Sequence, residues 1–137
     1  MAKFNVTGFE EVEKELLKHT KRAQSAVPKM LESGSKVLVK AQKSTIRKMG
    51  VYDTGQLHDS IKATKVKDKD GAKYVDVYPH GTDDKGVRNA TKGFIAEYGT
   101  SSIAARPWMS TANSRYADEV HDAMRAAWEE EMSGGDG

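Results

Sequence analysis

One tripeptide in the sequence could carry acid–base chemistry. Asp53-Thr54-Gly55 has the composition of the triplet that holds the catalytic aspartate of aspartic proteases, and in the retroviral type two such aspartates share a proton across a dimer. Those enzymes are all-β chains with apolar strands around the triplet. Here the triplet follows a predicted long helix and continues with polar residues. A loop in which Thr54 caps a short turn and Gly55 takes a positive φ explains the same residues without catalysis.

No other catalytic or metal-binding pattern stands out. The chain has no cysteine, which excludes disulfides, thiolate zinc sites and cysteine nucleophiles. Asp83-Asp84 lacks the alternating acidic pattern and closing glutamate of a calcium loop. The sequence has no nucleophile elbow, phosphate loop or dinucleotide fingerprint, and no pair at metal-ligand spacing among its four histidines, His19, His58, His80 and His121. It therefore predicts a protein that is not an enzyme and that takes no cofactor, metal ion or small-molecule substrate.

Five basic side chains form a second candidate feature, a row on one side of a predicted helix. They follow one another at steps of 7, 4, 3 and 4 and comprise Lys29, Lys36, Lys40, Lys43 and Arg47. Such a basic stripe could follow the phosphates of nucleic acid, which need rows of cations and no particular base sequence. No aromatic residues are interleaved with it, so a base-stacking surface is not indicated. The simpler interpretation is a solvated helix face.

The composition points to one small domain with a thin core. Leu, Ile, Val and Phe account for 23 of 137 residues and Ala for 15, while the net charge is only +2. Disorder requires low hydrophobicity together with strong net charge, so we expect a folded chain. We predict a single domain over residues 1–132 and a disordered tail over 133–137, with buried surface gained from partners. No apolar run is long enough to span a membrane, and no secretion signal is visible at the N-terminus.

Charge is distributed unevenly along the chain. Residues 1–50 carry 11 basic and 5 acidic side chains, whereas residues 101–137 carry 3 basic and 7 acidic ones. A basic end and an acidic end favour head-to-tail contacts between copies, or contacts with two different neighbours. Two solvated helix faces of opposite sign would give the same pattern.

Periodicity predicts an α+β fold. Apolar residues recur at helical steps from a capping box at residues 7–10 to Gly50, with a kink or short break near Pro28. Residues 62–68 and 73–78 flank Asp70-Gly71, a favoured pair for a hairpin turn. We expect residues 81–92 to form a mobile loop and residues 93–99 a third strand of the antiparallel sheet. Pro107 suits the start of a last long helix over residues 108–131.

Three stretches in this order resemble the tail-completion family of long-tailed bacteriophages, small neck proteins that join head to tail. The first is Asp53-Thr54-Gly55-Gln56-Leu57-His58-Asp59-Ser60-Ile61, the second Phe94-Ile95-Ala96-Glu97-Tyr98-Gly99-Thr100 and the third Ala105-Arg106-Pro107-Trp108. The resemblance covers about residues 8–130. The chain departs from the family pattern at His58, where a basic residue is common, and at Ser110-Thr111-Ala112, where the family usually has Pro-Ala.

The resemblance implies a structural virion protein without catalytic activity. Such a protein is assembled in the host cytoplasm and completes the tail at the head–tail junction. Its partners are further copies of itself in a ring, most naturally of six, together with neighbouring neck and tail proteins. Genome DNA only passes through the ring. A small nucleic-acid-binding protein that uses the basic stripe is the alternative.

Fourteen residues are candidates for contacts within this assembly. Ten come from the three motifs: Asp53, Thr54, Gly55, Leu57, Glu97, Tyr98, Gly99, Arg106, Pro107 and Trp108. Four come from the charged loop over 81–92: Asp83, Asp84, Lys85 and Arg88. We expect this loop and the hairpin tip at residues 67–73 to order only on assembly. Trp108 suits a buried anchor, and Glu97 either pairs with Arg106 or a basic group of the next copy, or faces solvent.

Overall fold

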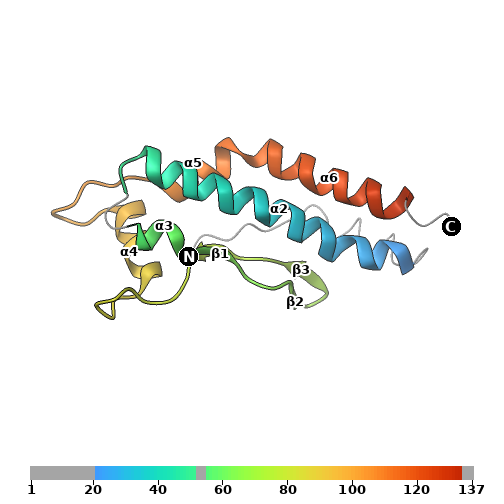
Figure 1. Ribbon diagram of the computed structural model, residues 1–137, viewed down its shortest axis with the longest axis horizontal. Helices are drawn as coiled ribbons and strands as arrows, with labels where there is room; N and C mark the ends of the chain where they lie inside the picture. The colour runs from blue at the N-terminus through green and yellow to red at the C-terminus, as the bar shows by residue number, and fades with distance from the viewer. Residues whose placement is uncertain (1–20, 52–54, 134–137) are drawn as a thin grey trace.

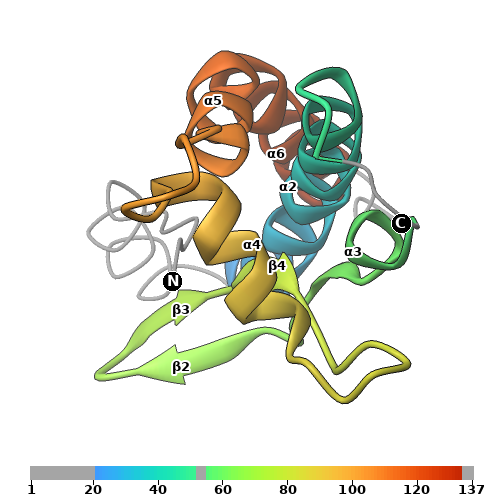
Figure 2. The same cartoon turned by 90° about the vertical axis from the view of Figure 1, so that its left-hand side faces the viewer.

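A computed structural model gives the structure of the chain and describes residues 21–51 and 55–133. Two long helices lie side by side, a β-hairpin covers one of them, and short helices gather at one end (Figures 1 and 2). The predicted α+β class is confirmed. None of the helices within the described ranges is long and apolar enough to cross a membrane.

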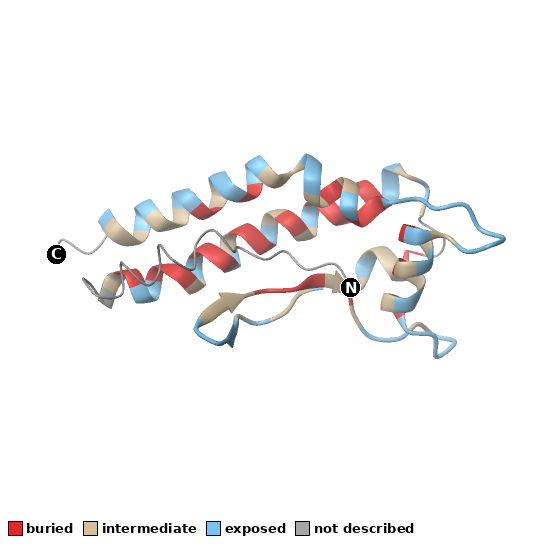
Figure 3. Cartoon of the chain, turned by 180° about the vertical axis from the view of Figure 1, so that it is seen from behind, coloured by how far each residue is buried: buried red, intermediate tan, exposed pale blue. Residues whose placement is uncertain are grey.

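The first described helix, α2 (Lys21–Lys48), is the backbone of the core. Its buried apolar residues recur at helical steps along one side, as Figure 3 shows, and include Ala23, Val27, Met30, Leu31, Leu38, Ala41 and Ile46. Pro28 lies inside the helix, which continues unbroken through it, so the alternative of a break is wrong. The predicted turns before residue 21 lie outside the described residues.

The end of α2 follows the sequence prediction at Gly50. This glycine has φ 75°. Its N–H donates to the Arg47 carbonyl at 3.1 Å, and the Val51 N–H donates to the Ile46 carbonyl at 2.9 Å. This is the Schellman pattern, in which a left-handed glycine turns the chain away from the helix axis.

The predicted last helix is instead two helices. α5 (Trp108–Arg115) and α6 (Ala117–Ser133) meet at Tyr116, whose φ of −104° and ψ of 12° interrupt the helix. The sequence before this point, residues 110–114, consists mainly of Ser, Thr and Asn, which bond to nearby backbone and favour turns over helix interiors. Residues 134–137 of the predicted tail lie outside the described residues.

α6 runs antiparallel to α2. The side chains of Gln42 and Asn113 are hydrogen-bonded at 3.0 Å towards one end, and Lys29 pairs with Glu131 towards the other. The helices approach closely at Gly34, where an added Cβ would lie 2.8 Å from Cγ of Met124. Among the described residues, the basic side chains of α2 and the acidic side chains of α6 therefore lie along the same pair of helices. They do not form opposite ends of the molecule, as the head-to-tail interpretation of the charge pattern assumed.

The predicted hairpin is confirmed, but each of its arms is divided into two short strands. β1 (Ile61–Ala63) pairs with β4 (Val77–Pro79), and β2 (Lys67–Lys69) pairs with β3 (Ala72–Tyr74), both antiparallel. Between the two pairs, the Thr64 N–H donates to the Asp76 carbonyl at 2.9 Å. Asp70 and Gly71 form the tip with φ of 55° and 85°, as a type I′ turn requires. The tip is thus formed in the single chain, contrary to the expectation that it orders only on assembly.

The predicted third strand is wrong, because α4 (Asn89–Tyr98) is a helix. Its buried residues Asn89, Gly93 and Glu97 stand at steps of four and face the body of the molecule. Gly93 permits this packing, since a Cβ there would lie 3.1 Å from Pro79 and 3.2 Å from Trp108. With α3 (Gln56–Asp59), α4 covers the end of the hairpin (Figure 2).

Candidate assembly surface

The first motif builds a turn and a short helix. Gly55 has φ 87° and stands directly before α3, which confirms the left-handed turn that the sequence predicts there. Leu57 is half-buried and packs against the core, and the Ser60 hydroxyl donates to its carbonyl at 2.7 Å. Asp53 and Thr54 lie outside the described residues. The described part of this motif shapes the fold, and Leu57 belongs to the edge of the core.

Glu97 is an intramolecular helix cap. Its carboxylate accepts hydrogen bonds from the Met109 N–H at 2.7 Å, the Ser110 N–H at 3.3 Å and the Ser110 hydroxyl at 2.6 Å. These are unpaired donors at the start of α5, where the helix dipole favours negative charge. The residue is only 8 % exposed. The predicted pair with Arg106 and the solvent-facing carboxylate are therefore wrong, while a pair with a basic group of the next copy stays a prediction.

Trp108 and Arg106 tie the same region together. Trp108 is fully buried, as predicted, and its indole N–H donates to the Gly93 carbonyl at 3.1 Å. The Arg106 guanidinium donates to the Gly50 carbonyl at 2.8 Å, and its backbone N–H donates to the Ala96 carbonyl at 2.6 Å. Pro107 lies between them, exposed, at the position before α5. The third motif thus joins α4 and α5 to the end of α2.

A projecting loop follows α4. Gly99 has φ 74°, and a Cβ there would lie 2.6 Å from the Ile103 carbonyl oxygen, so only glycine fits. The Thr100 N–H donates to that carbonyl at 2.8 Å, and the Thr100 hydroxyl accepts from the Ile103 N–H at 3.0 Å. All seven residues from 101 to 107 are exposed. The loop is held in one conformation by its own hydrogen bonds and presents its side chains to solvent.

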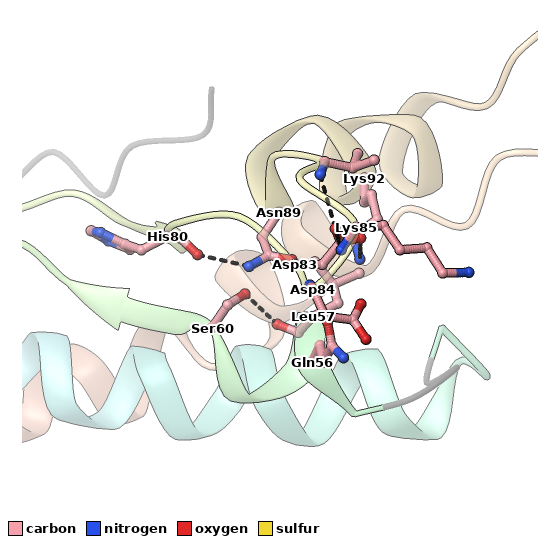
Figure 4. Close-up of polar contacts among 10 residues, drawn as sticks. Gln56, Leu57, Ser60, His80, Asp83, Asp84, Lys85, Asn89 and Lys92 are labelled. Carbon is pink, nitrogen blue, oxygen red and sulfur yellow. Dashed lines mark hydrogen bonds and ion pairs between the residues drawn. The ribbon is translucent and has the colours of Figure 1, made fainter.

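Asp83 organises a second loop at the same end of the molecule (Figure 4). Its carboxylate accepts from the Lys92 ammonium at 2.8 Å and from the backbone N–H groups of Lys85 and Val87, each at 2.9 Å. The Lys92 hydrogen bond, followed by that from Val87, lowers the pKa of Asp83 to about 2. A bridge between Thr82 and Arg88 closes the loop. The expectation that residues 81–92 form a loop that orders only on assembly is therefore wrong, because this bridge closes residues 82–88 and residues 89–92 belong to α4.

The remaining candidates of this loop are exposed. Asp84, Lys85 and Arg88 all face solvent, and the Asp84 N–H reaches the Gln56 side-chain oxygen at 3.3 Å. Behind them Asn89 is buried and donates to the His80 carbonyl at 2.9 Å. The base of the loop is fixed to α3 and β4, while its charged residues remain available for contacts.

The basic stripe is partly used within the chain. Lys29 pairs with Glu131, and this hydrogen bond raises the pKa of Lys29 and lowers that of Glu131. Lys36, Lys40 and Arg47 are exposed, and Lys43 is half-buried. The other four cations lie on α2, and three of them are exposed.

Of the apolar surface at this end, the sequence analysis named Tyr98 as a contact candidate and missed the other three residues. Ile95 and Tyr98 lie on the outer side of α4, Ile103 on the projecting loop and Val87 on the Asp83 loop, and all four are exposed. Their only sequence signal is the spacing of Ile95 and Tyr98, which lie on the side of α4 opposite its buried residues. No group of three or more His, Cys, Asp or Glu side chains that could hold a metal is found within residues 21–51 and 55–133.

Comparison with known families gives one match. A family model described as "Bacteriophage HK97-gp10, putative tail-component" matches residues 10–98. These residues include the first motif, the hairpin, the Asp83 loop and the whole of α4. No curated protein and no solved structure matches the chain significantly.

Proposed function

The chain belongs to the HK97-gp10-like family of bacteriophage tail components, and from this premise we propose that it completes the head-proximal end of the tail and joins it to the head. A tail component is part of the virion and works through contacts with other phage tail proteins. We propose the neck as its position and a closed ring of copies, most naturally six, as its form. The protein does this as a structural part, without catalysis.

The observation that carries this proposal is a pair of preorganised loops at one end of the molecule. The Asp83 loop and the loop after α4 are each fixed by intramolecular hydrogen bonds, and their charged and apolar side chains face outward. A contact surface that is already ordered loses little conformational entropy on binding. Two such loops suit a connector that must meet its neighbours in a fixed geometry.

The test is a phage in which the gene for this chain carries a stop codon. Electron microscopy of the lysate should show filled heads and tails of normal length that are not joined. Intact virions would contradict the proposal, and so would the absence of tails, which would indicate a role in building the tail tube. A loop deletion is a poor test, because residues 83–89 include Asp83 and Asn89, which hold the fold locally. The substitutions Lys85→Glu and Arg88→Glu change only exposed side chains and should reduce joining.

A further inference from the structure

An apolar surface projects from the end of the molecule that carries α4. Tyr98 is 67 % exposed, Ile103 51 % and Ile95 38 %. We call these three residues the apolar tip. Tyr98 also stacks on Phe94, with ring centroids 5.4 Å apart. A group of large apolar side chains in solvent marks a surface that another molecule covers.

The apolar tip is fixed to the fold by hydrogen bonds, unlike a loop that makes no contacts of its own. Tyr98 and Ile95 belong to α4, and Ile103 is bonded through both its N–H and its carbonyl to Thr100. Arg106 anchors the far end of the loop to α4 and to the end of α2. Figure 1 shows this loop extending beyond α5. The backbone is therefore set before any partner arrives.

A hollow of suitable character lies elsewhere on the same chain. It lies between α2 and the junction of α5 with α6 and measures about 300 Å³. Its lining includes apolar side chains and two charged ones, and consists of Val37, Lys40, Ala41, Ser44, Tyr116 and Glu119. The interruption of the helix at Tyr116 is part of this site. The hollow can receive one or two apolar side chains.

The α6 side of the hollow is complementary in charge to the loops around the apolar tip. Lys85, Arg88 and Arg106 are exposed on those loops, beside one exposed acidic residue, Asp84. At the hollow, the first turns of α6 expose Asp118, Glu119 and Asp122, whereas the α2 side carries Lys40. α6 as a whole has six acidic residues and one arginine. Charges of opposite sign set the orientation of an encounter between such surfaces.

We propose that the apolar tip of one copy inserts into the hollow between α2 and the α5–α6 junction of the next copy. This inference rests on the proposed function, because it names the contact that would build the ring. Tip and hollow are different surfaces of one chain, so the contact is heterologous, and repeating it gives a closed ring if the rotation between copies closes.

The test uses one variant of each surface and a matched control. Ile103→Asp places a charge on the apolar tip, and Ser44→Phe fills the hollow from the half-buried side of α2. Val87→Asp makes the same kind of change at another exposed apolar residue, which lies on the Asp83 loop. A second hollow variant, Glu119→Arg, alters only an exposed side chain at the rim. Circular dichroism establishes that each variant is folded, and sedimentation velocity measures its mass.

Wild-type protein and Val87→Asp should associate as concentration rises, whereas each tip or hollow variant alone should remain monomeric. An equimolar mixture of Ile103→Asp with a hollow variant should give heterodimers and nothing larger. In that mixture the intact tip of the hollow variant inserts into the intact hollow of Ile103→Asp. The altered tip and the altered hollow of the same pair cannot bind a further copy. This result is specific to a heterologous contact, because a symmetric contact between two tips would not be restored by mixing.

Three results would overturn the inference: wild-type protein that stays monomeric at all concentrations, tip and hollow variants that associate like wild type, or a mixture that gives no heterodimer. The stop-codon phage distinguishes these failures from failure of the proposed function. Unjoined heads and tails together with any of the three results would leave the joining role in place and remove only this contact.

Discussion

The Glu97 carboxylate, on α4, accepts a hydrogen bond of 2.7 Å from the backbone N–H of Met109, in the first turn of α5. Pro107, at the cap position of α5, contributes no side-chain hydrogen bond. The cap is therefore supplied by a residue more than ten positions earlier in the chain. Because α4 provides it, the loop that carries Ile103 is closed at its base.

Replacing Glu97 should weaken the whole end of the molecule. Glu97→Gln keeps the size of the side chain but removes its charge and one acceptor, and should lower the free energy of unfolding by about 1–3 kcal/mol. Urea denaturation followed by circular dichroism measures the change. Glu130→Gln, an exposed residue near the end of α6, is the control and should have little effect. Equal stability of both variants would show that the cap contributes nothing.

Gly99 and Gly71 should differ in how much an added side chain costs, because Gly99 combines steric overlap with a ψ of −179°, a backbone region that essentially only glycine adopts. Both have positive φ, 74° and 85°, but a Cβ at Gly99 would lie 2.6 Å from the Ile103 carbonyl oxygen, whereas nothing lies within 4 Å at Gly71. Gly71→Ala should cost about 1–2 kcal/mol from the left-handed conformation alone. Gly99→Ala should cost more and should also displace the projecting loop. Thermal unfolding of the two variants compares them, and an equal loss would rule out the overlap.

The pKa of Asp83 gives the Asp83 loop a defined pH dependence. The folded value is about 2 and the ordinary value 3.8, so the stabilisation is present above pH 4 and is lost as the pH falls towards 2. An NMR titration of the carboxyl carbon should show this midpoint. Lys92→Met removes the hydrogen bond that lowers the pKa of Asp83 most, so this pKa should rise. It should stay below 3.8, because the backbone N–H groups of Val87 and Lys85 still donate to the carboxylate. Lys85→Met keeps those donors and should leave the value unchanged.

The basic stripe should not bind duplex DNA in the way a nucleic-acid-binding protein does. Sedimentation with duplex DNA should show no complex at low or at moderate salt. Lys36→Gln with Lys43→Gln should leave self-association unchanged. A salt-sensitive complex whose log–log slope falls by about 1 for each of these substitutions would contradict this account and favour the nucleic-acid-binding alternative.

Local rules predicted those features that depend on a few adjacent residues. The left-handed glycines at Gly50 and Gly55 and the hairpin turn at Asp70-Gly71 each follow from backbone geometry that few other residues adopt. The buried side of α2 followed from apolar residues at helical steps. In each of these patterns, the residue types themselves determine the local structure.

Features set by tertiary contacts were not predictable in the same way. The aromatic content of residues 93–99 indicated a strand. These residues are instead part of helix α4 up to Tyr98, and its packing through Gly93 against Pro79 and Trp108 favours the helix. Glu97 caps α5 only because α4 is brought beside it. The exposure of Ile103 depends on how far its loop projects, which composition does not encode. The sequence therefore named candidate assembly residues but not which of their side chains are exposed and which are buried in the fold.

The most direct measurement of the central claim is in vitro complementation of the stop-codon lysate. Purified wild-type protein is added to the unjoined heads and tails, and infectious particles are counted against the amount added. Infectivity should rise with added wild-type protein until it saturates. The double variant Lys85→Glu with Arg88→Glu should restore fewer infectious particles at the same amount of protein. A lysate of complete heads and tails that gains no infectivity from folded wild-type protein would contradict the proposed joining role.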